Sequence, residues 1–69
     1  MEQDAIKKKE GLIQELATNA RISEYGCSCA VLAGDWERAR LEAERADIFR
    51  SSLIKTIENF VKSIEKEEE

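Results

Sequence analysis

Apolar and small residues recur every three or four positions along both halves of this 69-residue chain. That spacing places them on one face of an α-helix, so it predicts two long amphipathic helices. The first series consists of Ile6, Ile13, Leu16, Ala20, Ser23, Cys27 and Ala30. The second consists of Trp36, Ala39, Ala43, Ala46, Leu53, Ile57, Phe60 and Ile64. Each series forms one apolar seam, and we expect the two seams to pack against each other.

The two series are separated by a short break, Ala33-Gly34-Asp35-Trp36. Glycine suits the left-handed conformation that ends a helix, and aspartate is a favoured N-cap because its carboxylate accepts a backbone N–H bond. We therefore predict an all-α fold: a coiled-coil-like antiparallel two-helix hairpin that forms one domain over residues 1–69. The expected helices span about 4–33 and about 36–65, with Asp4 as the first N-cap, a turn at 34–35 and a frayed acidic tail at 66–69.

Folding the chain back at Gly34 places large side chains opposite one another near the chain ends and small ones near the turn. The expected opposing pairs are Ile6 with Ile64, Ile13 with Ile57, Leu16 with Leu53, Ser23 with Ala46, Cys27 with Ala43, and Ala30 with Ala39. Arg50 falls on the predicted seam, where an unpaired guanidinium would be costly. Its head group is therefore expected to reach solvent or a carboxylate.

Further apolar residues lie outside the predicted seam. On the first helix they form a second stripe roughly opposite the seam, and on the second helix they point away from the seam or widen its edge. A helix that is apolar on two faces needs two neighbours, and the hairpin supplies one. We therefore predict association into a helical bundle, with a helical partner protein, with a second copy of the chain, or with both. The candidate partner-binding residues are Ile22, Tyr25, Cys29, Leu32, Leu41, Ile48, Ile54 and Val61.

The composition of the chain argues against an enzyme or a metal-binding protein. The chain has no histidine, the commonest general base and metal ligand, and a hairpin has no interior for a catalytic site. Cys27 and Cys29 supply only two thiolates, where structural zinc needs four ligands. We therefore expect no enzymatic activity, no cofactor and no metal. The two thiols diverge by roughly 200° on a helix, so they are expected to stay reduced, as in the cytoplasm.

The net charge of -4 argues against nucleic acid as a partner. Lys7-Lys8-Lys9 is basic, but in a hairpin it lies beside the acidic run Glu65 to Glu69, so we expect the two to neutralise each other. The chain contains no run of about 18 apolar residues, so no membrane span is predicted.

Two resemblances to known families follow from the turn. Gly34-Asp35-Trp36-Glu37-Arg38-Ala39, followed by Ala43 and Ala46, resembles the turn between the two helices of a tetratricopeptide repeat. The likeness covers about a third of the chain, and the predicted second helix continues past the point where such a repeat ends. We interpret the likeness as a similar tight turn between two helices, and not as a tetratricopeptide repeat.

The second resemblance covers nearly the whole chain. The length, the mid-chain Gly34-Asp35 turn and the run Leu53, Ile54, Ile57, Phe60, Val61 and Ile64 resemble the small E-type co-chaperones of type III secretion needles. Trp36 and the two cysteines depart from that pattern. The resemblance implies a cytoplasmic helical hairpin that pairs with a tetratricopeptide-like G-type partner. Together the two would hold the needle subunit unpolymerised before export.

Two alternative functions share this architecture. A small regulatory hairpin dimer, similar to plasmid copy-control bundles and acting on protein or RNA, would need a basic face. A phage-encoded inhibitor fits the acidic charge but would need carboxylates along one face. Arg38, Arg40 and Arg45 instead alternate with Glu37, Glu42 and Glu44, as expected for a solvated face of i,i+4 pairs.

Overall fold

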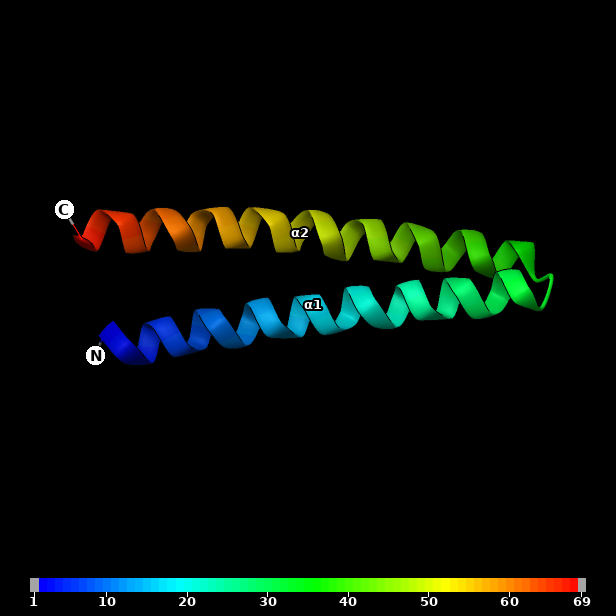
Figure 1. Ribbon diagram of the computed structural model, residues 1–69, viewed down its shortest axis with the longest axis horizontal. Helices are drawn as coiled ribbons and strands as arrows, with labels where there is room; N and C mark the ends of the chain where they lie inside the picture. The colour runs from blue at the N-terminus through cyan, green and yellow to red at the C-terminus, as the bar shows by residue number, and fades with distance from the viewer. Residues whose placement is uncertain (1, 69) are drawn as a thin grey trace.

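The computed structural model describes the backbone of residues 2–68 and the side chains of residues 4–66. It consists of two α-helices, α1 (Glu2–Leu32) and α2 (Trp36–Glu68), packed against each other. The helices run antiparallel as two long rods, so Glu2 and Glu68 lie at the same end of the molecule (Figure 1). The Cα atoms extend over 52 × 17 × 12 Å. This architecture confirms the predicted all-α helical hairpin.

The helices differ from the predicted boundaries at the end where the chain termini lie, which we call the open end. α1 begins at Glu2, so Asp4 lies within its first turn and is not its N-cap. α2 continues to Glu68, into the tail that was predicted to fray. Glutamate, glutamine and lysine favour helical backbone, which extends both helices by some residues. At the turn, α1 ends at Leu32, one residue before the predicted end.

The turn ends α1 and begins α2 within three residues. Gly34 adopts a left-handed conformation with φ of 74°. The Asp35 N–H donates to the Ala30 carbonyl at 2.9 Å and the Gly34 N–H to the Val31 carbonyl at 3.0 Å, which together form a Schellman motif. The Asp35 Oδ1 then accepts a bond from the Arg38 N–H at 3.2 Å and caps α2. The structure thus bears out Gly34 as the helix terminator and Asp35 as the N-cap.

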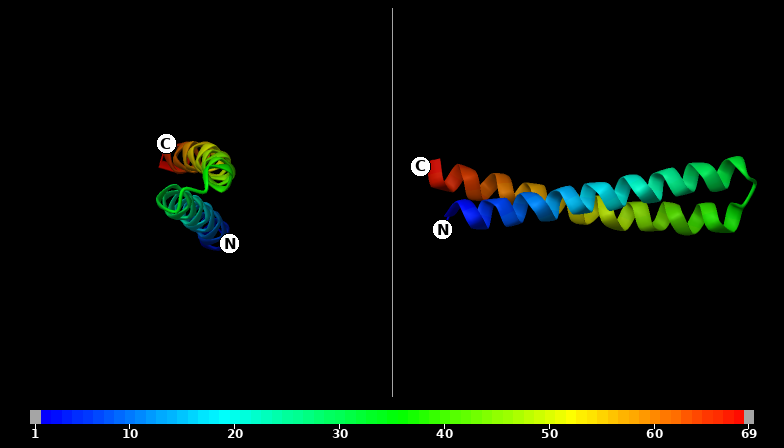
Figure 2. Two further views of the ribbon diagram at one scale, coloured as in Figure 1. Left: turned by 90° about the vertical axis from the view of Figure 1, so that its right-hand side faces the viewer. Right: turned by 90° about the horizontal axis from the view of Figure 1, so that it is seen from below.

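Burial is concentrated in the half of the hairpin next to the turn. The buried residues there are small: Ala20, Ser23, Ala30, Ala39 and Ala46. Among the side chains that the structure describes, none in the open half is buried; the large ones on the seam there, such as Phe60, are half-buried. The two ribbons converge toward the turn and separate toward the open end (Figures 1 and 2). Small side chains allow the helix axes to approach, whereas isoleucine, leucine and phenylalanine hold them apart.

α2 is rotated relative to the predicted seam. Trp36, Ala43, Arg50 and Ile57 were expected to face α1, but all four are exposed. The seam instead follows a strict alternation of three and four residues: Ala39, Glu42, Ala46, Phe49, Leu53, Thr56 and Phe60. The predictions for Ala39, Ala46, Leu53 and Phe60 therefore stand, those for Ala43, Arg50 and Ile57 were wrong by one residue, and Ile64 is half-buried.

The rotation has a physical reason in the residues that change places. It brings the Phe49 ring inward and moves the Arg50 guanidinium outward, where it forms an ion pair with Glu24. It also brings Glu42 against Gly26. The two residues are so close that a Cβ atom added at residue 26 would collide with the Glu42 carboxylate. Exchanging a seam arginine for a phenylalanine removes the cost of desolvating the guanidinium, and the Glu42 carboxylate that enters the seam accepts a hydrogen bond from Arg45.

Candidate protein-interaction surfaces

The outer stripe of α1, defined as Ile22, Tyr25, Cys29 and Leu32, lies opposite the seam and is exposed over its whole length. Tyr25 is 73% exposed and Leu32 is 88% exposed, so neither contributes to the core of the hairpin. Large apolar residues scattered singly over a surface are ordinary, whereas four in a row on one helix form a continuous patch. This arrangement matches the stripe that the sequence predicted.

A groove lies beside the outer stripe, at the turn end of the molecule. It has a volume of about 490 Å³ and is lined by Ile22, Tyr25, Gly26, Cys29, Ala30, Ala33, Asp35, Arg38 and Glu42. We call it the turn groove. The Glu42 carboxylate occupies the position that a side chain at Gly26 would take, and the small side chains of Ala30 and Ala33 leave space beside it. One wall is apolar and comes from α1, and the other is charged and comes from α2.

Glu42 is the most enclosed charged group of the turn groove. Its side chain is only 15% exposed, and its Oε1 accepts a bond from the Arg45 Nη1 at 3.2 Å. Arg38 lies one helical turn before it on the same wall. The groove therefore offers an apolar surface next to a carboxylate and a guanidinium, a combination that accepts an amphipathic side chain from a partner.

The sequence did not indicate the turn groove, because its two walls come from residues far apart in the chain. Gly26, within a helix otherwise rich in good helix formers, was the one available signal. Its partner Glu42 was assigned to a solvated face, since the register of α2 had been placed one position away. The groove follows only once the two helices are docked.

The remaining predicted contact residues fall on two different flanks of the hairpin. Leu41 and Ile48 continue the helical stripe of Arg38 and Arg45, so they lie on the flank of the turn groove. Ile54 and Val61 continue the stripe of Arg50 on the opposite flank, which we call the Arg50 flank. All four apolar residues are exposed. The predicted contact set therefore does not form one continuous surface.

An ion pair between the two helices lies on the Arg50 flank. The Arg50 Nη2 contacts the Glu24 carboxylate, and its Nη1 lies 3.9 Å from the Asp47 Oδ1. The prediction that this guanidinium would meet a carboxylate is confirmed, and the prediction that it would lie on the seam is not. Because both side chains of the Arg50–Glu24 pair are about half exposed, the pair contributes little to stability, on the order of 1 kcal/mol or less.

The back of α2 carries a charged network near the turn. The Arg40 guanidinium donates to Glu37 at 2.7 Å and to Glu44 at 3.1 Å. The hydrogen bond to Glu37, followed by the charge of Glu44, raises the pKa of Arg40. All three residues are exposed, so this face is solvated as the alternating charges predicted.

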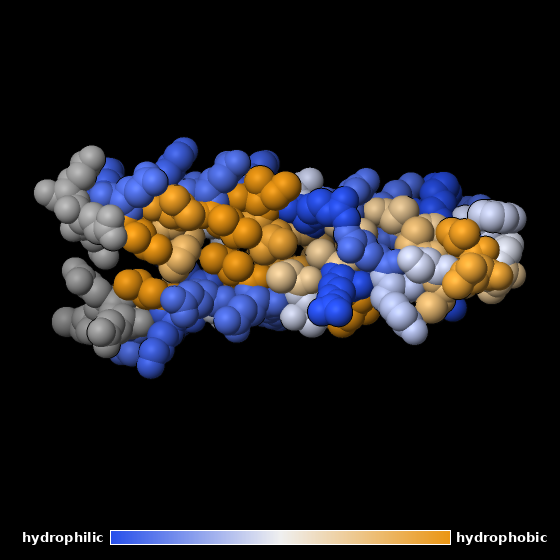
Figure 3. Space-filling model, viewed as in Figure 1, coloured by the Kyte–Doolittle hydropathy of each residue, from blue (hydrophilic) through white to orange (hydrophobic). Residues whose placement is uncertain are grey.

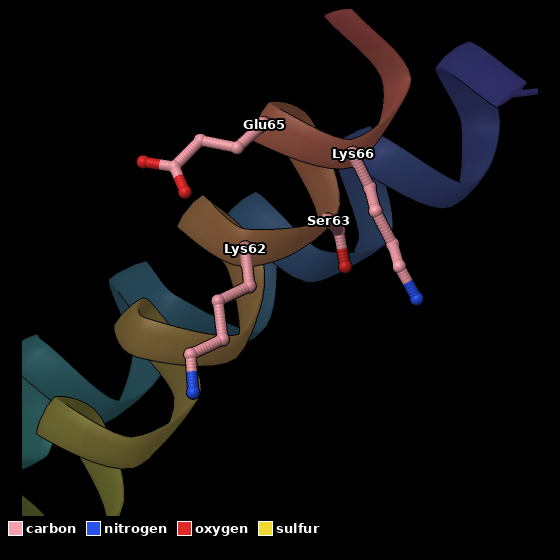
Figure 4. A pocket seen from close by; sticks show the side chains of 4 residues that line it. All are labelled: Lys62, Ser63, Glu65 and Lys66. Carbon is pink, nitrogen blue, oxygen red and sulfur yellow. The ribbon is translucent and has the colours of Figure 1, made fainter. Parts of the chain in front are cut away.

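Neither a hollow near the open end nor the two cysteines forms a ligand site. A hollow of about 390 Å³ near the open end is lined by Lys62, Ser63, Glu65 and Lys66 of α2 alone (Figure 4). The Lys62 and Lys66 side chains extend in a similar direction and Glu65 extends away from them, and all three are exposed, so they do not converge on an enclosed site. Cys27 is half-buried on the seam, Cys29 is exposed, and both thiols are free. Among the side chains of residues 4–66, no group of three histidine, cysteine, aspartate or glutamate residues is placed to hold a metal ion.

Over the described part of the chain, neither helix has the length and apolar content needed to cross a lipid bilayer. Comparisons of the chain with protein family models, with curated protein sequences and with solved structures found no match.

Proposed function

We propose that this chain is a non-enzymatic protein-binding module that docks onto the helices of a partner through the outer stripe of α1 and the turn groove. The observation that carries the proposal is the exposure of Ile22, Tyr25 and Leu32 on a helix whose opposite face is already packed against α2. Full burial of a large apolar side chain is worth roughly 1.5–3 kcal/mol. Covering three of them gives roughly 4.5–9 kcal/mol, which is of the same order as the cost of association, so contacts in the turn groove must add to it for a specific complex.

The proposed complex uses the two walls of the turn groove differently. A partner helix lying along α1 covers Tyr25 and Leu32 with its apolar face. A side chain from that helix enters the groove between Tyr25 and Glu42, where apolar surface and a charged group are both within reach. Tyrosine is common at the centre of protein interfaces because it combines a large apolar ring with a polar end.

In its more specific form, the proposal is that the chain acts as a small co-chaperone of a type III secretion needle subunit. The resemblance of the Gly34-Asp35 turn and of the apolar run in α2 to the E-type co-chaperones supports this form. The partner would be a tetratricopeptide-like protein, whose stacked helices present a concave surface to the hairpin. The assembly would hold the needle subunit unpolymerised in the cytoplasm.

Photo-crosslinking in the cells that express the chain tests both forms. A photoreactive phenylalanine replaces Tyr25 in one variant and Ser51, an exposed position on the back of α2, in the control. The proposal predicts an abundant adduct from residue 25, with a helical-repeat protein and a needle subunit in the same complex, and little adduct from residue 51. Equal adducts from the two positions would contradict protein binding through α1. An adduct with a helical protein unrelated to secretion would contradict only the co-chaperone form.

A further inference from the structure

α2 has two sets of residues that could face α1, and the observed seam uses one of them. Both sets share Ala39, Ala46, Leu53 and Phe60. The observed set adds Glu42, Phe49, Thr56 and Ser63. The second set adds the residues that directly follow these in the chain: Ala43, Arg50, Ile57 and Ile64. A rotation of α2 about its own axis by roughly 50°, half of the 100° between consecutive residues, would exchange the two sets.

Three of the four exchanges favour the second set. On the observed seam, Glu42, Thr56 and Ser63 are half-buried polar residues. The residues that would replace them are Ala43, Ile57 and Ile64. Of these, Ile57 is exposed, and Figure 3 shows apolar side chains of both helices gathered over the open half of one face. Covering an isoleucine in place of a threonine or a serine removes apolar surface from water, which is favourable.

The hydrogen bonds of the polar groups on the observed seam lie within α2. The Thr56 hydroxyl donates to the Ser52 carbonyl at 2.7 Å, and the Ser63 hydroxyl donates to the Asn59 carbonyl at 3.0 Å. The Glu42 carboxylate also accepts its bond from a residue of α2. These partners turn with the helix, so a rotation of α2 breaks none of the three bonds.

The fourth exchange, between Phe49 and Arg50, opposes the second set. Phe49 is half-buried on the observed seam, whereas the Arg50 guanidinium lies outside it and pairs with Glu24. A rotation would expose the phenyl ring and draw the guanidinium toward the seam, away from water. Because the other three exchanges favour rotation, the observed position of α2 depends on this one pair of neighbouring residues.

The space that a rotation needs is present on both sides of the seam. On the Arg50 flank, a hollow of about 280 Å³ lies between the helices, with Cys27 of α1 and Ala43 of α2 among its lining residues. Rotation would move Ala43 into this hollow and Glu42 outward into the turn groove. The buried residues of the seam are alanines and a serine, whose short side chains interlock little and so oppose the movement little.

We propose that α2 is a two-position element that rotates against α1 between the observed set and the second set, and that Phe49 and Arg50 determine its position. The Cα atoms of a helix lie about 2.3 Å from its axis, so a rotation of roughly 50° displaces each of them by about 2 Å. Gly34, in the left-handed conformation with φ of 74°, gives the turn the backbone freedom to follow this displacement.

The rotation would also change the shape of the turn groove. In the observed position, the Glu42 carboxylate lies against Gly26, and in the second position it leaves that contact. A ligand that fits the groove in only one of the two shapes would therefore hold α2 in the corresponding position. The inference does not depend on the proposed function, because both positions belong to the isolated hairpin.

Alkylation of single cysteines tests the rotation in the full chain with Cys27 and Cys29 replaced by alanine. Thr56→Cys and Ile57→Cys, in separate proteins, place a thiol at a half-buried and at an exposed position. The rate of reaction with a maleimide under native conditions measures the exposure of each thiol, and we expect residue 57 to react faster. The exchange Phe49→Arg with Arg50→Phe keeps the composition and the net charge. We expect it to speed the reaction at residue 56, slow the reaction at residue 57 and change the ratio of the two rates about tenfold.

The matched control is Arg40→Leu with Leu41→Arg, which exchanges an arginine with a neighbouring apolar residue at two exposed positions of α2. We expect this exchange to leave residue 57 the faster. The rate at residue 56 is the decisive reading, because contact with another molecule can slow residue 57 but does not expose residue 56. An unchanged order after the first exchange, the same change after both exchanges, or faster reaction at both residues with loss of helicity would overturn the proposal, since the second position is expected to keep the hairpin folded.

Discussion

Replacing Tyr25 and Leu32 by aspartate is expected to lower the affinity for the helical partner by at least about 100-fold and to leave the hairpin folded. Both side chains are mostly in solvent in the free chain, so their loss removes no contact from the core. In the complex, each aspartate would bury a carboxylate where an apolar group had been. Titration calorimetry with the partner captured from residue 25 measures the affinity, and far-ultraviolet circular dichroism measures the helicity.

A control variant separates loss of apolar surface from added charge. Ser51→Asp with Asn59→Asp adds the same two negative charges at exposed positions of α2. This variant is expected to bind the partner with nearly wild-type affinity. An equal loss of affinity would show that net charge, and not the outer stripe, governs binding. Loss of helicity in the Tyr25 and Leu32 variant would place these residues in the folding core and contradict the structure.

Replacing Ala46 by leucine is expected to lower the free energy of unfolding by about 1–3 kcal/mol. Ala46 is 4% exposed and lies on the seam in the half of the hairpin next to the turn. The extra carbon atoms have no space there, so the helices must separate or the side chain must adopt a strained rotamer. Urea denaturation followed by circular dichroism measures the change.

Ala43→Leu is the matched control for the rotation of α2. The periodicity of the sequence placed Ala43 on the seam, whereas the structure exposes it. The same substitution is therefore expected to change the free energy of unfolding by no more than about 0.5 kcal/mol. The reverse order, with Ala43→Leu the more damaging, would show that the originally predicted seam is correct and the structural register wrong.

The turn could be predicted from sequence because its chemistry is local. Gly34 and Asp35 act on backbone groups within five residues, and the hydrogen bonds of the structure are those the residue types require. The small side chains beside the turn and the large ones near the open end were also readable from spacing. The helix ends at the open end were harder to predict, because runs of lysine and glutamate favour helix and contain no residue that ends one.

The register of α2 could not be predicted because two seams fit the same periodicity. Both seams contain Ala39, Ala46, Leu53 and Phe60. The predicted seam continues from each of these residues by four positions and then three, whereas the observed seam continues by three and then four. The two seams therefore differ only at the positions in between. The choice depends on contacts with α1: Glu42 against Gly26, and Arg50 with Glu24. Such contacts join residues far apart in the chain, so a pattern within one helix does not contain them.

The dependence on contacts between the two helices also explains which parts of the candidate interaction surface could be predicted. The outer stripe of α1 belongs to a single helix and followed from spacing alone. The turn groove combines residues of both helices. Its position became apparent only from the docked pair, which also separated Leu41 and Ile48 from Ile54 and Val61.

The central claim is that this hairpin exposes apolar surface which another polypeptide must cover. Thermal unfolding followed by circular dichroism, on the purified chain from about 5 to about 500 µM, tests it most directly, because association with the folded state raises the melting temperature with concentration. We predict a rise of several degrees across this range. A constant melting temperature for a monomeric chain, together with equal photo-adducts from residues 25 and 51, would contradict the account.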